Sequence, residues 1–122
     1  MKLAGEGDLK MRRKVVFHID EIDQWQRTSQ NIHNLCDYVA TVPEEQLQVI
    51  VVVNGDAIQG YLQAIGEQTV AQHPSVKFHA CHNAMQKHHI NGDQLPAAVQ
   101  IVPVGVLDLI QLQAAGFAYI KP

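Results

Sequence analysis

Apolar residues along the chain alternate between two patterns. In one they form short continuous runs, and in the other they recur every three or four residues among polar ones. The strongest run is Val49 to Val53, five consecutive apolar residues. It predicts a strand over 47–53 that is covered on both faces, as at the centre of a parallel sheet. Four other segments have the β-branched and aromatic composition of short strands. They cover residues 14–19, 76–80, 99–102 and 117–120.

Helical spacing separates these strands. The first helical segment follows Asp20 and places six residues on one face: Trp25, Thr28, Ile32, Leu35, Cys36 and Val39. A second helix is expected from Asn54-Gly55-Asp56 to Pro74, a short third one over 81–89, and a last one from Gly105 to a C-cap at Gly116. Strands that alternate with helices predict right-handed βαβ units. The expected fold class is therefore α/β, a three-layer α/β/α sandwich with a mostly parallel sheet of about five strands.

Length and charge limit the organisation and the partners. The 122 residues have room for one domain, and we expect a mobile leader over 1–13 and a single domain over 14–122. Net charge is −3, which lacks the basic footprint of a nucleic-acid-binding protein. No apolar run reaches the roughly 18 residues of a membrane span, and the polar start does not resemble a secretion signal. We expect a cytoplasmic protein that binds neither nucleic acid nor membrane.

The last helix is more apolar than a helix packed on one sheet requires. Its apolar residues span an arc of roughly 220°, against roughly 100° for a single packed stripe. They are Val106, Leu107, Leu109, Ile110, Leu112 and Ala114. The surplus fits either further packing within the chain or a contact between subunits.

Polar and reactive residues gather where the predicted strands end. Ligands of open parallel sheets bind outside the carboxyl ends of the strands. The residues at these ends are His18, Asp20, Asn54, Asp56, Cys81, His82, Asn83 and 103–105. The Asn54-Gly55-Asp56 segment also fits a tight turn into the second helix.

Cys81 is the sharpest candidate for chemistry. It lies where a strand gives way to a helix, so helix N–H groups and the positive end of the helix dipole are expected to face its sulfur and favour the nucleophilic thiolate. The alternative is a buried, inert cysteine. Cys36 lies on the apolar stripe of the first helix and is expected in the core. The two cysteines lack a CxxC spacing, which favours free thiols over a disulfide framework.

Other chemistries have little support. His79, Cys81 and His82 offer zinc-type ligands, but His79 belongs to a strand and His82 to a helix, so they need not converge. We predict no metal and no cofactor. The chain contains no GxGxxG, GxxxxGK[ST] or GxSxG motif.

Several separated segments resemble the stand-alone members of the DsrE/DsrF-like family. The similarity covers residues 14–122. The segments are Val15-Val16-Phe17-His18-Ile19-Asp20, Val53-Asn54-Gly55-Asp56-Ala57-Ile58, Ala80-Cys81-His82-Asn83-Ala84-Met85, Val102-Pro103-Val104-Gly105-Val106 and Gly116-Phe117-Ala118-Tyr119-Ile120-Lys121-Pro122.

The resemblance implies a fold, an assembly and a function. The fold is the α/β/α sandwich, and the assembly is a homotrimer or hexamer. Sulfur-relay members carry sulfane sulfur as a persulfide on a cysteine after the third strand, a position that Cys81 matches. A sulfur carrier or sulfurtransferase-like protein with donor and acceptor proteins is then expected, with five neighbours of Cys81 as binding residues: His18, Asp20, Asn54, His82 and Asn83. The alternative is a non-catalytic oligomeric module with a small-molecule-binding or regulatory role.

Overall fold

The computed structural model describes residues 12–122 as an α/β fold built on one parallel sheet. Its strands are β1 (Arg12–Ile19), β2 (Gln46–Val53), β3 (Lys77–Cys81), β4 (Gln100–Val102) and β5 (Ala118–Ile120). They pair in the order β4-β3-β2-β1-β5, and all pairs are parallel. The predicted leader over 1–13 falls mostly outside the described residues, and β1 begins within its last two positions.

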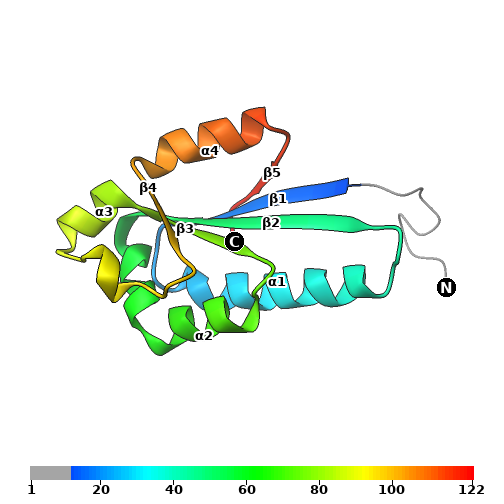
Figure 1. The fold of residues 1–122 in the computed structure, drawn as a ribbon, viewed down its shortest axis with the longest axis horizontal. Helices are drawn as coiled ribbons and strands as arrows, with labels where there is room; N and C mark the ends of the chain where they lie inside the picture. Colours follow the sequence, from blue (N-terminus) through cyan, green and yellow to red (C-terminus); the bar gives the residue numbers. More distant parts are fainter. Residues whose placement is uncertain (1–11) are drawn as a thin grey trace.

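Helices cover both faces of the sheet, which confirms the predicted three-layer sandwich (Figure 1). One face carries α1 (Gln24–Ala40), the 3₁₀ helix η1 (Gly55–Leu62) and α2 (Ala64–Gln72). The other face carries α4 (Gly105–Ala114), and Gly116 follows it with the positive φ expected of a C-cap glycine. At the carboxyl end of the sheet lie α3 (His82–Lys87) and the short η2 (Gly92–Gln94). Between residues 12 and 122, no helix combines the length and apolarity of a membrane span.

The strand order explains why α4 lies apart from the other helices. The chain moves in one direction across the sheet from β1 to β4, and it then returns past β3, β2 and β1 to add β5 at the opposite edge. Right-handed crossovers place their connections on one face when the chain advances and on the opposite face when it returns. The single return crossover therefore carries α4, which begins at the carboxyl ends of the strands.

The core has two parts, one on each face of the sheet. The larger part surrounds Trp25, Tyr61 and Phe78, whose side chains are almost completely buried. The smaller part lies beneath α4 and consists of Val16, Ile50, Val52, Leu109 and Phe117. Alternate residues of β1 and β2 supply the two parts, as the period-two geometry of a strand requires.

The prediction of one continuous second helix is wrong. It is divided into η1 and α2 by Gln63, whose backbone is extended. The division lets the start of α2 pack directly on η1, because a side-chain carbon at Gly66 would overlap the carbonyl oxygen of Gly60. Gly60 in turn lies against the indole of Trp25, which donates a hydrogen bond to the carbonyl oxygen of Ala57. Apolar periodicity could not reveal this backbone contact.

The contact gives a stability prediction. Gly66→Ala is expected to lower the free energy of unfolding by about 1–3 kcal/mol, because the new methyl group meets a backbone carbonyl that cannot move aside. Helix propensity alone predicts a gain of about 1 kcal/mol for the same change. Urea denaturation measures the difference. Gly92→Ala is the control, since its methyl group would meet only the flexible end of Ile101, and a stabilised Gly66→Ala protein would contradict the packing argument.

Candidate functional site

Cys81 is the last residue of β3 and the residue that precedes α3. Its thiol is free and its side chain is buried, with 5% of the residue exposed. The sulfur accepts a hydrogen bond from the backbone N–H of Gly105, with a nitrogen–sulfur distance of 3.3 Å. The N–H group that reaches the sulfur thus comes from the first turn of α4 and not, as the sequence led us to expect, from the helix that Cys81 itself begins.

Gly105 allows α4 to approach this closely. A β-carbon at this position would lie 3.2 Å from the β-carbon of Asn54 and 3.3 Å from that of Cys81. It would also lie 3.3 Å from Nδ2 of Asn54. Both side chains therefore flank the same point at the start of α4. The first N–H groups of a helix have no partner within the helix and lie at its positive end, so this point favours negative charge.

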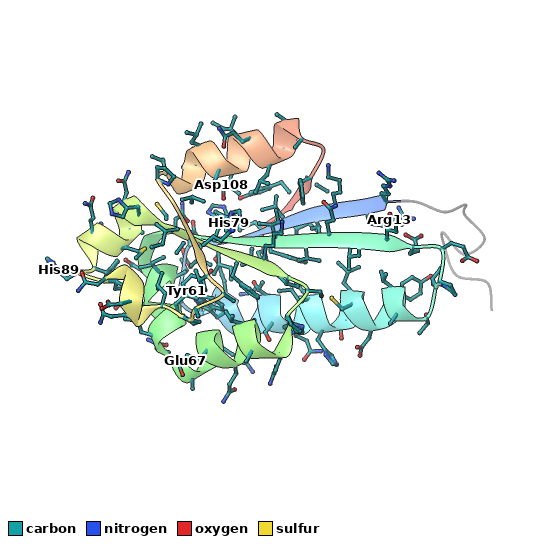
Figure 2. All side chains as sticks on the ribbon, in the orientation of Figure 1. Arg13, Tyr61, Glu67, His79, His89 and Asp108 are labelled. Carbon is teal, nitrogen blue, oxygen red and sulfur yellow. The ribbon has the colours of Figure 1, made fainter. Side chains whose placement is uncertain are left out.

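His79 fixes the same turn of α4 to β3. It is two residues before Cys81, and its Nδ1 lies 2.7 Å from Oδ2 of Asp108 in the first turn of α4. An ionised carboxylate only accepts hydrogen bonds, so Nδ1 carries the proton. Both side chains are about nine-tenths buried. Figure 2 shows the pair between the sheet and α4.

Tyr61 holds the backbone of His79 from the opposite face of the sheet. Its hydroxyl donates to the carbonyl oxygen of His79 at 2.9 Å. Complete burial raises the pKa of Tyr61 well above its usual value, so the phenol remains a donor. The end of β3 that leads to Cys81 is thus fastened on both faces, with Tyr61 below it and Asp108 above it in Figure 2.

Two predicted binding residues, His18 and Asn54, form one hydrogen-bonded group beside this site. Nε2 of His18 lies 2.8 Å from Oδ1 of Asn54, and Nδ1 lies 2.6 Å from the hydroxyl of Tyr119. His18 comes from the end of β1, Asn54 follows β2, and Tyr119 belongs to β5. The structure thus brings His18, Asn54 and Cys81 together around the start of α4.

The third predicted binding residue at these strand ends, Asp20, has a structural partner. Lys121 contacts its Oδ1 at 2.6 Å. The hydrogen bond from Lys121 is the main reason why the pKa of Asp20 is lowered, and the positive charge of Lys121 acts in the same direction against the opposing effect of burial. Asp20 therefore ties the end of the chain to the end of β1.

His82 and Asn83 are exposed in the first turn of α3. His82 lines a cleft of about 570 Å³ together with Met85, His89 and Ile101. The two residues thus lie beside Cys81 in the chain, at the surface of the site.

The other sequence expectations concern Cys36 and metal ligands. Cys36 is half-buried on α1, and burial together with the charge of Asp37 raises the pKa of its thiol. Across residues 12–122, no group of three or more histidine, cysteine, aspartate and glutamate side chains is arranged to hold a metal ion. His79, a candidate ligand in the sequence, is paired with Asp108.

Comparison with known proteins gives the family. The model of the DsrE/DsrF-like family matches residues 7–122. The chain belongs to the DsrE/DsrF-like family. Among solved structures it is similar to MTH1491 from Methanobacterium thermoautotrophicum, a protein of unknown function, with 30% identity, a TM-score of 0.75, and coverage of 90% of this chain and 99% of that one. A search of curated proteins finds no match.

Sequence reasoning missed three residues of this DsrE-like site. Gly105 is expected from the sequence only as a strand-end residue and the start of the last helix, although a glycine at the start of an apolar helix is also a sign of close backbone approach. The sequence gives no sign of the side-chain contacts of Asp108 and Tyr119, because their partners are 29 and 101 positions away in the chain.

The Asp20–Lys121 ion pair gives a prediction with a defined pH dependence. The folded-state pKa of Asp20 is below its ordinary value of 3.8, so the pair stabilises the protein above that value, and this contribution is lost as pH falls through the folded-state pKa. Lys121→Met should lower the free energy of unfolding at neutral pH by up to about 1 kcal/mol, since the pair is partly exposed. Denaturation of both proteins between neutral pH and pH 3 should show the two stabilities converging at the acid end. Lys77→Met is the control, and a difference that does not change with pH would contradict the assignment.

Proposed function

We propose that this DsrE-like protein is a persulfide carrier or sulfurtransferase-like protein that acts through Cys81. The observation that carries the proposal is the N–H group of Gly105 directed at the sulfur of Cys81. A helix N-terminus stabilises negative charge, and both the thiolate and the persulfide of Cys81 are anions. Membership of the DsrE/DsrF-like family supports the same chemistry.

The transfer step needs no external oxidant or reductant. The thiolate of Cys81 attacks the outer sulfur of a donor persulfide, and a new S–S bond forms at Sγ. The S–S bond of the donor breaks, and its electron pair leaves with the donor sulfur as a thiolate. Delivery to an acceptor thiolate repeats the exchange in the opposite direction and restores Cys81.

Burial of Cys81 sets a requirement on this chemistry. The attacking sulfur must approach its target in line, and Cys81 is only 5% exposed. Loading therefore requires a displacement of neighbouring groups. The segment before Gly105 is the part of the site suited to this movement, since Val104 is exposed and precedes the helix. Burial also protects a loaded persulfide from unspecific thiols.

The partners and the compartment belong to the same proposal. Donor and acceptor proteins supply and receive the sulfur, and both cysteines of the chain are free thiols, as a reducing cytoplasm requires. In a homotrimer or hexamer, the outer face of α4 would form the contact between subunits. Three apolar residues there, Val106, Leu107 and Ile110, are each about half exposed, and contiguous apolar surface commonly marks a subunit contact.

Intact-mass spectrometry tests the carrier function. Incubation with a sulfane-sulfur donor should add the mass of one sulfur atom to the wild-type protein and to Cys36→Ser, because burial and the charge of Asp37 raise the pKa of the Cys36 thiol and so disfavour its nucleophilic thiolate. The Cys81→Ser variant should gain none. Equal labelling of both cysteines, or labelling of neither, would reject the proposal.

A sedimentation experiment tests the assembly. Ile110→Glu should convert an oligomer into monomers, because the new charge would have to lose its hydration at an apolar contact. Gln111→Glu is the matched control, since it places the same charge one position along the helix on a polar residue. A monomeric wild-type protein, or an oligomer unchanged by Ile110→Glu, would contradict the contact.

A further inference from the structure

We infer that Tyr119 and His18 are positioning residues that turn the amide of Asn54 toward the sulfur site, where Asn54 donates a hydrogen bond to the terminal sulfur of a Cys81 persulfide. The inference rests on the proposed carrier function and assigns roles to three residues from three different strand ends. It starts from two observed hydrogen bonds and one close approach.

The hydrogen bonds connect the three side chains in a row. The hydroxyl of Tyr119 lies 2.6 Å from Nδ1 of His18, and Nε2 of His18 lies 2.8 Å from Oδ1 of Asn54. The imidazole of His18 also packs against the ring of Tyr119, with 5.7 Å between the centroids. His18 thus uses both ring nitrogens within the row.

Donor and acceptor chemistry gives the row a direction. Oδ1 of Asn54 can only accept, so Nε2 of His18 carries a proton. In neutral His18 the other nitrogen, Nδ1, then accepts from the Tyr119 hydroxyl. Protonated His18 keeps the same arrangement at Asn54, because both its nitrogens are donors. In either state the Nδ2 amino group of Asn54 is left for the opposite side.

That opposite side is the start of α4. Nδ2 of Asn54 and the β-carbon of Cys81 each lie 3.3 Å from the point that a Gly105 β-carbon would occupy. An amino group there adds a second donor to the N–H of Gly105, as in an oxyanion hole. A reversed amide would present its oxygen to the sulfur and repel an anion.

The ring nitrogens of His18 provide a test that does not depend on sulfur transfer. ¹⁵N spectra of histidine-labelled protein at neutral pH should show a proton on Nε2 of His18, and His18→Gln identifies the signal among the seven histidines. Tyr119→Phe keeps the ring but removes the hydroxyl, and should give a mixture of tautomers. A wild-type His18 with the proton on Nδ1 alone would overturn the inference, because Asn54 would then be reversed.

The lifetime of the persulfide tests the role of the amide. The loaded Asn54→Ala protein should lose its sulfur to a small thiol roughly tenfold faster than wild type, the effect of one hydrogen bond to a charged group. Tyr119→Phe should act in the same direction, by roughly threefold, since it weakens only the orientation of the amide. Loss rates equal to wild type in both variants would overturn the inference.

Matched controls separate this inference from the carrier function. Asn34→Ala and Tyr38→Phe make the same chemical changes on exposed positions of α1, and both should leave the loss rate unchanged. A wild-type protein that cannot be loaded rejects the carrier function and with it the role of Asn54. Normal loading with unaltered loss in Asn54→Ala and Tyr119→Phe rejects the positioning role alone. Circular dichroism of each variant establishes that it is folded.

Discussion

The approach of α4 to Cys81 is the contact on which the site depends. It requires a return crossover that carries a helix over the second face of the sheet, with a glycine as its first residue. The N–H of Gly105 then reaches the sulfur at 3.3 Å, and the side chain of Asn54 lies against the same glycine. The helix that follows Cys81 directly, α3, has only six residues, and the N–H group that reaches the sulfur comes from α4 instead.

Most of the fold could be predicted because its signals are local. The unbroken apolar run of β2 indicated a central strand, and alternation of strands and helices indicated the parallel sheet. The division between η1 and α2 could not be predicted, since it depends on a backbone contact between Gly60 and Gly66 that leaves the apolar spacing intact. The third strand also ends one residue later than the predicted 76–80, because Cys81 pairs with Val102 of β4.

The position of the candidate site could be predicted from the sequence, but the side-chain contacts within it could not. The rule that ligands bind at the carboxyl ends of parallel strands selected His18, Asn54 and Cys81, which do lie together. It equally selected Asp20, whose carboxylate is bound to Lys121. It gave no reason to choose Tyr119 or Asp108. Side-chain pairs of this kind join positions far apart in the chain, and a single sequence carries no record of them.

The first turn of α4 links the thiol to the protein surface. Gly105 contacts the sulfur, Asp108 is bound to His79, and between them Val106 and Leu107 expose apolar side chains to the outside. A subunit or partner packed on those two residues would press the same turn against β3. Its binding energy would oppose the movement of the adjoining segment before Gly105 that we propose for the loading of Cys81, whereas its departure would permit that movement. Association on α4 would therefore be coupled to access to the sulfur, because the groups concerned are held within four consecutive residues of one helical turn.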